Sequence, residues 1–213
     1  MIPHQVHVVW IGNRPNPHES YLESWTRLNP GWELRYWTDA NLPRMRHRRI
    51  IDAIPHASGR VNVIRLELLA RYGGVYSDAD SECLRPLGPL VAGRQAVAMT
   101  GRRGGIQNAT LACAPGDPWF TRLVDAIPGW FDRLRASKRN RHGKGVDFRA
   151  VFGTRYITPV LRGHRGLWLP DGRASEGRRR VICERHEQCD DTVIVHDQAG
   201  SWRAQLGGRR VRL

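Results

Sequence analysis

Short apolar runs alternate with segments of helical period along the first forty residues. Residues 6–11 are apolar and mostly β-branched, and they end at Gly12, a pattern typical of a buried strand that turns into a loop. Residues 21–28 have apolar side chains at helical spacing, and residues 33–38 alternate as a second strand would. A strand, a helix and a second strand in this order predict a parallel sheet with helices packed on its faces.

A longer amphipathic segment leads directly to two acidic residues. Apolar residues recur every three or four positions over residues 60–72, which predicts a helix, and Gly73 readily takes the left-handed conformation that ends one. Residues 75–77 then extend again as a strand and lead to Asp78 and Asp80. Because ligands bind at the carboxyl ends of strands in open α/β sheets, we expect a ligand at this pair.

Two further strands and a long helical region are predicted in the middle of the chain. The runs at residues 95–99 and 109–114 have the composition of strands. Asp117 and Pro118 form a good helix start, with an acidic N-cap before proline at the first helical position. The helix that follows is expected to break near Pro128.

The C-terminal part of the chain contains two basic polar stretches. We expect a mobile loop over residues 133–144, and a second loop over residues 171–180, which end in three arginines. A helix is predicted between them over residues 147–161. Residues 193–195 are expected to form a final strand that leads to His196.

The composition is that of an ordinary globular protein with an unusual charge. Hydrophobic residues make up 40% and charged residues 25% of the 213 residues, and we expect a single domain over residues 1–213. Lys and Arg number 34 against 20 Asp and Glu, a formal net charge of +14. Such a field concentrates polyanions such as nucleic acid, acidic glycans or anionic lipid headgroups, although a GC-rich coding bias, which enriches arginine, would produce the same count.

The sequence predicts neither export nor a membrane span. The N-terminus has no basic region followed by a long apolar stretch, and no apolar run approaches the ~20 residues that cross a bilayer. We therefore expect a cytoplasmic protein with reduced thiols, at most peripheral to a membrane or to nucleic acid. Cys183, His186 and Cys189 form a C-x2-H-x2-C cluster that could hold zinc with a fourth ligand, and the spacing leaves this question open.

The acidic pair has three interpretations: a divalent metal site, an acid/base pair, or two solvated turn residues. Residues i and i+2 of an extended backbone point to the same side, so Asp78 and Asp80 can converge on one ion. Hard oxygen ligands suit Mg²⁺ or Mn²⁺, which can bridge phosphate oxygens and balance the charge of a departing diphosphate. Two acids at this spacing arise by chance in many chains, so their context decides between the three.

The residues that precede the pair form a longer pattern. Residues 62–80 read NVIRLELLARYGGVYSDAD. This run closely resembles the signature of the DXD-type sugar transferases of glycosyltransferase family 32, which are related to yeast α-mannosyltransferases and capsular polysaccharide transferases. It is more distantly similar to the glucosylating domains of large clostridial toxins. Other segments that match the family follow in order along the chain: residues 8–12, 29–33, 37–39, 108–109, 115–118, 195–196 and 200–202.

The resemblance implies a fold, a donor and roles for single residues. The implied fold is α/β and GT-A-like, with a mostly parallel central sheet flanked by helices, and it binds a nucleotide sugar with a retaining outcome. Trp10 would stack on the nucleobase, and its alternative is a core tryptophan beneath the sheet. Arg65 would contact the donor sugar and phosphate, and its alternative is a surface arginine paired with Glu67 or Glu82. Asp78 would bind the ribose and metal-bound water.

The remaining implied roles concern the metal and the diphosphate. Asp80 would coordinate the metal directly, and His196 would complete the metal ligands. Ser201 and Trp202 would donate hydrogen bonds to the diphosphate. Asn62 departs from the family, which usually has aspartate at this donor-binding position, so the preference for one donor sugar is not implied. The residues predicted to act in catalysis are Arg65, Asp78 and Asp80.

These features together predict a metal-dependent glycosyltransferase. We expect it to need Mn²⁺ or Mg²⁺ and to transfer a hexose from a UDP- or GDP-sugar to an acceptor hydroxyl. A glycan or glycolipid, a protein, and a polyanion such as DNA with a hydroxylated base all remain open as acceptors. The alternatives are a basic nucleic-acid-binding protein, a DNA-modifying glycosyltransferase that combines both activities, and a nucleotidyl- or phosphotransferase. The last leaves the segment that follows His196 unexplained.

Overall fold

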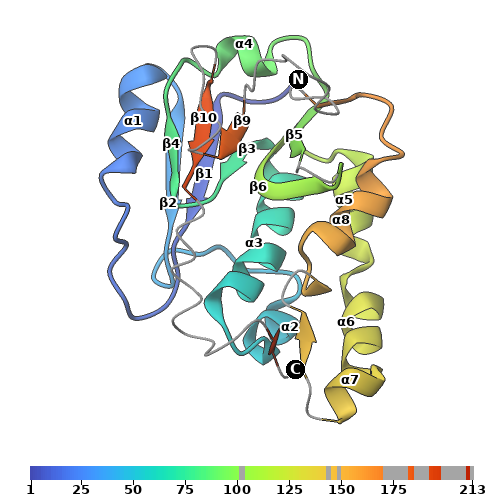
Figure 1. Cartoon of the computed structure of the whole chain (residues 1–213). Coiled ribbons are helices and arrows are strands. Elements are labelled where there is room, and N and C mark those ends of the chain that lie inside the picture. Colours follow the sequence, from blue (N-terminus) through green and yellow to red (C-terminus); the bar gives the residue numbers. More distant parts are fainter. Residues whose placement is uncertain are drawn as a thin grey trace.

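The protein has a mixed α/β fold (Figure 1). The computed structural model describes residues 1–100, 104–142, 145–147, 150–169, 182–184, 192–197 and 210–211. The strands are β1 (Gln5–Val9), β2 (Glu33–Trp37), β3 (Gly74–Ser77), β4 (Ser81–Cys83), β5 (Ala96–Thr100), β6 (Ile106–Cys113), β7 (Val146–Asp147), β8 (Leu167–Trp168), β9 (Ile182–Glu184), β10 (Ile194–His196) and β11 (Arg210–Val211). The helices are α1 (Tyr21–Leu28), α2 (Arg48–Ala53), α3 (Ala57–Tyr72), α4 (Gly88–Val91), α5 (Pro118–Asp125), α6 (Ile127–Ala136), α7 (Lys138–Arg141) and α8 (Thr154–Leu161).

The central sheet has six strands in the order β2-β1-β3-β6-β5-β8. Strand β1 pairs in parallel with β2 and β3, and β5 pairs in parallel with β8. Strand β6 is antiparallel to both of its neighbours, β3 and β5. Parallel pairings therefore predominate, and the expected α/β class with a mostly parallel central sheet is confirmed. Two small sheets accompany it, β4-β10-β9 and β11-β7.

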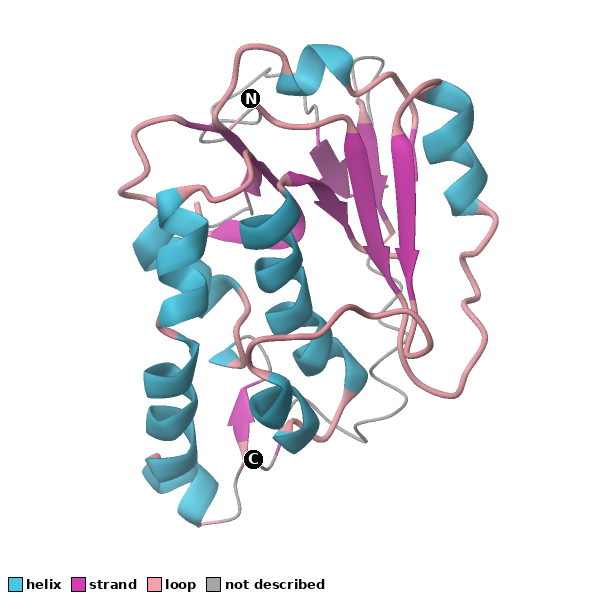
Figure 2. Ribbon diagram, turned by 180° about the vertical axis from the view of Figure 1, so that it is seen from behind, coloured by secondary structure: helices cyan, strands magenta, loops and turns pink. Residues whose placement is uncertain are grey.

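Protein packs against both faces of the central sheet (Figures 1 and 2). Helices α3, α5, α6 and α8 form one core with it, and α1, α4 and β10 form the other. Successive strand residues alternate between the two cores: Val8 and Val97 belong to one, and Val9 and Ala98 belong to the other. All five residues of β1 are buried, as expected of a parallel strand that is covered on both faces.

Helix α3 leads into the site and is almost surrounded by protein. Every residue from Val61 to Leu69 is buried, including the charged ones. The helix begins after His56, whose side chain accepts a hydrogen bond from Gly59 N. It ends at Gly73, where φ is 65°, so the end predicted from the glycine is confirmed.

His7 joins β1, β2 and the end of α3. Trp37 Nε1 donates a hydrogen bond to His7 Nδ1 over 3.0 Å, and His7 Nε2 lies 3.0 Å from Gly73 O. Because an indole N–H can only donate, the ring is the neutral tautomer with its hydrogen on Nε2, which donates to the carbonyl. Burial lowers the pKa of His7 to about 4. The ring therefore stays neutral near pH 7 and holds α3 against the sheet.

The helix start predicted at Asp117 is confirmed, and so is the break that follows. The Asp117 side chain accepts hydrogen bonds from Trp119 N and Phe120 N. Helix α5 ends before Ala126, and α6 begins after it, two residues from the predicted break. Within the described residues, no helix is long and apolar enough to cross a membrane.

The prediction of a mobile loop over residues 133–144 is wrong as far as Arg141, and residues 143–144 lie outside the described ranges. Helix α6 continues to Ala136, and α7 follows over Lys138–Arg141. Arg and Lys are good helix formers, and Ser137 Oγ caps α7 by accepting a hydrogen bond from Asn140 N. A helix can therefore form here without an apolar face.

The helix expected over residues 147–161 is too long at its N-terminus. Helix α8 begins only at Thr154, because Phe152 has φ 58° and Gly153 is extended, and neither conformation is helical. The loop expected over residues 171–180 lies outside the described residues.

Candidate active site

Asp78 and Asp80 lie in a tight turn between β3 and β4. Asp78 N donates to Ala109 O over 2.8 Å, which extends the pairing of β3 with β6 by one residue. Ser81 N then donates to Asp78 O over 3.0 Å and closes the turn. The carboxylates converge as predicted, but a turn and not an extended backbone brings them together.

His196 approaches the two carboxylates from another strand. It is the last residue of β10, which pairs antiparallel with β4 so that His196 lies opposite Ser81. Its Nε2 atom lies 3.1 Å from Asp80 Oδ1 and 3.8 Å from Asp78 Oδ2. One ligand atom from each of the three side chains lies within 4.8 Å of the others. The three predicted metal ligands are therefore brought together by the β4–β10 pairing.

Arg65 reaches the same place from the middle of α3. It is 4% exposed, and its NH1 atom lies 2.9 Å from Asp78 Oδ1. The same nitrogen donates to Asn108 O, and the guanidinium lies over the Tyr76 ring at 4.4 Å from the ring centroid. The alternative of a surface arginine is wrong, because the side chain is buried and its carboxylate partner is Asp78.

The electrostatics of Asp78 reflect opposing effects. Its side chain is 24% exposed, and burial raises the pKa of Asp78 above the usual carboxyl value, while the charges of Arg65 and His196 oppose this shift. Tyr76 Oη donates a hydrogen bond to Asp78 Oδ1 over 2.8 Å. Burial also raises the pKa of Tyr76 well above its usual value, so the phenol remains a donor. Asp78 is thus oriented by two side chains before any ligand binds.

Trp10 follows β1 at the carboxyl edge of the sheet and is partly exposed. Its indole Nε1 donates to Arg14 O over 2.7 Å, and its backbone N donates to Trp37 O over 2.9 Å. Gly12 N donates to Asp39 Oδ2 over 2.7 Å, which fastens the loop after Trp10 to the end of β2. Sequence reasoning assigned no role to Asp39, although the segment 37–39 is one of the matched segments.

Asn62 uses both polar atoms of its side chain within the protein. Its Nδ2 atom donates to Val151 O over 2.9 Å, and its Oδ1 atom accepts from Asn108 Nδ2 over 2.7 Å. Asn108 is therefore a second residue that sequence reasoning left without a role. Its side chain meets Asn62, and its carbonyl accepts from Arg65. The predicted contact of Asn62 with a donor remains a prediction.

A known family matches the part of the chain that contains Arg65, Asp78 and Asp80. Residues 15–97 match the family described as a glycosyltransferase sugar-binding region containing a DXD motif. Asp78 and Asp80 are the two aspartates at DXD spacing in the matched residues, beside the buried Arg65.

Residues 15–97 are thus similar to glycosyltransferase sugar-binding regions. An inositol phosphoceramide mannosyltransferase of Schizosaccharomyces pombe is 30% identical over 139 residues, which are 60% of this chain and 37% of that protein. The matched part therefore spans well under half of the relative. The resemblance to DXD-type sugar transferases is confirmed.

Solved glycosyltransferase domains share the fold of this DXD protein. The PaToxG glycosyltransferase superposes with a TM-score of 0.55 at 14% identity, covering 77% of this chain and 70% of the other. The UDP-bound glycosyltransferase domain of the YGT toxin gives a TM-score of 0.54 at 13% identity and covers 79% of each chain. The GT-A-like fold is confirmed.

The DXD site has the donor atoms that a divalent cation requires. Two carboxylates and an imidazole nitrogen converge, and two negative charges face one arginine, so the cluster can accept more positive charge. Predominantly oxygen ligands fit Mn²⁺ or Mg²⁺. Ser201 and Trp202 lie outside the described residues, as do His186 and Cys189 of the cysteine–histidine cluster and the side chain of Cys183.

Proposed function

We propose that this protein transfers a sugar from a nucleotide-diphosphate sugar to an acceptor hydroxyl, and that it requires Mn²⁺ or Mg²⁺. The supporting observation is the convergence of Asp78, Asp80 and His196 within a DXD region, on the fold of glycosyltransferase domains. A turn after a buried strand presents the two acids at the edge where α/β sheets bind ligands.

Asp78, Asp80 and His196 would hold the cation, which supplies positive charge to a departing diphosphate. Arg65 neutralises part of the charge of Asp78 and fixes its orientation, because its guanidinium is buried between Asp78 and the carbonyl of Asn108. The same cation and a buried guanidinium can stabilise the charge that develops as the bond to the sugar breaks. We propose a retaining outcome, as the family resemblance implies.

The proposed donor is a UDP- or GDP-sugar. Trp10 would stack on the base, since its ring is partly exposed and its loop is fastened by Asp39. Ser201 and Trp202 would bind the diphosphate. One structural neighbour, the glycosyltransferase domain of the YGT toxin, binds UDP, which favours a uridine nucleotide here.

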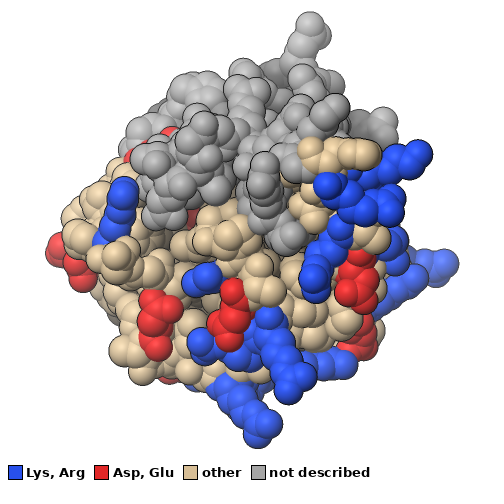
Figure 3. All heavy atoms as spheres, turned by 90° about the horizontal axis from the view of Figure 1, so that it is seen from below, with Lys and Arg blue, Asp and Glu red and all other residues tan. Residues whose placement is uncertain are grey.

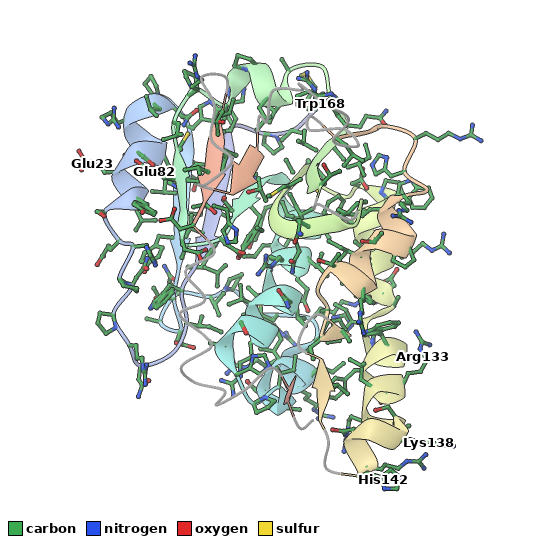
Figure 4. The ribbon with its side chains drawn as sticks, in the orientation of Figure 1. Glu23, Glu82, Arg133, Lys138, His142 and Trp168 are labelled. Carbon is green, nitrogen blue, oxygen red and sulfur yellow. The ribbon has the colours of Figure 1, made fainter. Side chains whose placement is uncertain are left out.

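A basic surface on α6 and α7 favours an acceptor with negative charge. Its exposed residues, which we call the α6–α7 basic surface, are Arg133, Arg135, Lys138 and Arg141. Figure 4 shows Arg133, Lys138 and His142 projecting outward on one side of the molecule, with Glu23 and Glu82 on the opposite side. Lys and Arg also predominate over part of the face of the molecule that Figure 3 shows.

The α6–α7 basic surface is joined to residues near the site. Trp130 Nε1, on α6, donates a hydrogen bond to Ala150 O over 2.7 Å. Val151, which follows Ala150, accepts a hydrogen bond from Asn62 Nδ2 at its carbonyl oxygen. The yeast relative is named for inositol phosphoceramide, an acceptor name that includes a phosphate group. We therefore propose an acceptor that carries phosphate, and DNA with a hydroxylated base stays open beside a phosphorylated glycolipid.

A donor-hydrolysis panel tests the reaction. Purified protein is incubated with Mn²⁺ or Mg²⁺ and the common UDP- and GDP-sugars, and the release of free nucleoside diphosphate is measured. We expect release from one nucleotide class that stops on addition of a chelator. If no donor releases nucleoside diphosphate and the protein binds DNA in a salt-sensitive way, the result would favour a nucleic-acid-binding protein instead.

The acceptor is tested by matched charge changes. Lys138→Ser/Arg141→Ser should weaken the binding of a phosphate-bearing acceptor and should make that binding less dependent on salt. It should have little effect on donor hydrolysis. Arg27→Ser/Arg85→Ser removes the same charge on and beside α1 and β4, on the other side of the molecule, and serves as the control. Equal weakening by both variants would mean that only net charge matters. Phospholipid vesicles and DNA duplexes as competitors separate the two kinds of acceptor.

A further inference from the structure

His196 lies at the end of a short strand, and the residue after it is held in two ways. Strand β10 covers only Ile194–His196. The backbone N of Asp197 donates a hydrogen bond to Asp80 O over 2.9 Å, which continues the pairing of β10 with the chain before β4. The position of His196 therefore depends on what fixes Asp197.

A side chain of α1 provides the second contact with Asp197. Tyr21 Oη donates a hydrogen bond to Asp197 Oδ2 over 2.5 Å. Both side chains are partly exposed. A hydrogen bond from a hydroxyl to an ionised carboxylate is shorter and stronger than one between neutral groups. The phenol can therefore hold Asp197 even at the surface of the protein.

Tyr21 can act as a fixed anchor because α1 is itself bonded to β4. Ser24 Oγ donates to Tyr21 O over 2.6 Å and accepts from Cys83 N over 3.0 Å. Trp25, which is 1% exposed, donates from Nε1 to Ser81 O over 3.2 Å. Figure 1 shows α1 beside β4. The backbone of Tyr21 is thus joined to β4, and its hydroxyl is joined to the residue that follows β10.

The nearer side chains do not replace this anchor. Ser81 lies opposite His196, but its Oγ atom is buried and has no hydrogen-bond partner within the described part of the chain. The contact of His196 with Asp80 is between two groups that would both bind the cation, so it would give way when the cation binds. Support for the imidazole in the loaded site must therefore come from further away.

We propose that Tyr21 is a positioning residue for the metal site, which holds His196 in place through Asp197. The inference rests on the proposed function and deepens it. Contacts behind a metal ligand fix its orientation and raise the affinity for the metal. The Tyr21 phenol is not one of the three converging groups, so its effect on a cation passes through His196.

The test is a double-mutant cycle with Mn²⁺ as the probe. Tyr21→Phe removes the hydroxyl and keeps the ring, and it leaves the charge of the site unchanged. It is made in the wild-type protein and in His196→Ala. Tyr156→Phe is the matched control, because Tyr156 Oη donates to Leu123 O and joins α8 to α5, away from β4 and β10.

Binding is measured without relying on turnover. The EPR signal of free Mn²⁺ is titrated with each protein, first without nucleotide and then with saturating UDP or GDP. Thermal melts of the same samples report stability. Asp78→Asn/Asp80→Asn gives the level of binding outside the site.

We expect Tyr21→Phe to weaken Mn²⁺ binding about fivefold, since direct partners of a metal ligand contribute roughly tenfold or more and Tyr21 acts one residue further away. In His196→Ala the same substitution should change the Mn²⁺ affinity no further. Tyr156→Phe should lower the melting temperature and leave the Mn²⁺ affinity unchanged.

Three results overturn the inference: an unchanged Mn²⁺ affinity in Tyr21→Phe, an equal loss with and without the His196 imidazole, and the same loss in Tyr156→Phe. A purely structural role of Tyr21 would give the second or the third. Failure of the proposed function is seen separately. Wild-type protein that binds Mn²⁺ no more tightly than Asp78→Asn/Asp80→Asn would overturn the proposed metal requirement itself, whatever Tyr21 does.

Discussion

Two aspartate–histidine pairs of similar geometry occur in this protein and differ in what surrounds them. His196 Nε2 lies 3.1 Å from Asp80 Oδ1, and His164 Nε2 lies 3.0 Å from Asp117 Oδ2. The side chains of the first pair are 13% and 17% exposed, and those of the second are 3% and 6% exposed. Residue type and distance therefore do not separate a site from a structural contact.

The Asp117–His164 pair is complete without a ligand. Asp117 Oδ1 accepts from Trp119 N and Phe120 N at the start of α5, and His164 Nδ1 accepts from Gly166 N. His164 Nε2 therefore has the ring hydrogen and donates it to Asp117. The Trp119 ring stacks on His164, with centroids 5.8 Å apart. This pair joins α5 to the segment after α8.

The Asp80–His196 pair has a second carboxylate beside it. Asp78 approaches the same imidazole, and Arg65 is the arginine that pairs with it. The carboxylates of Asp78 and Asp80, which offer ligand atoms within 4.8 Å of each other, repel each other unless a cation lies between them. Convergent charge and partial exposure, and not the aspartate–histidine contact itself, distinguish the DXD site.

The largest expected effect is that of Asp80→Asn on turnover, and the same substitution at Asp117 is its control. Asp80→Asn should lower donor turnover roughly a hundredfold or more, because it removes one charged ligand of the proposed cation. Its melting temperature should not fall, since the substitution also removes like-charge repulsion. Initial rates of nucleoside diphosphate release measure the turnover, and thermal melts measure the melting temperature. Asp117→Asn is the control and should keep its turnover per folded molecule. Wild-type turnover in Asp80→Asn would remove that residue from the site.

A smaller effect, on stability alone, is expected at the second pair. Asp117→Ala should lower the free energy of unfolding by about 2 kcal/mol, because it removes the α5 cap and leaves His164 without its acceptor. Asp117→Asn should lower the free energy of unfolding by less, since asparagine is also a good N-cap. Urea unfolding measures the difference. A loss of turnover at full stability would instead assign the Asp117–His164 pair a part in the reaction.

Much of the local structure could be predicted from patterns within a few residues. The apolar run of β1, the helical period before Gly73 and the Asp117–Pro118 start all correspond to observed elements. The errors occur where a local pattern is weak. Helix α7 has no apolar face, and the segment around Phe152, where φ is 58°, contacts Trp130, Tyr156 and Asn62, which come from other elements.

The sequence by itself determined the DXD pair, the α/β alternation and the resemblance to DXD-type sugar transferases, because these depend on residue types at short spacings. Only the tertiary structure decided which groups meet the pair. His196 reaches it through the register of β10 on β4, and Arg65 reaches it because α3 packs beneath the turn. Asn62 acquires its hydrogen-bond partners from Asn108 of β6 and from Val151, which precedes α8. Strand register and helix packing are set by burial over the whole core, so no short segment encodes them.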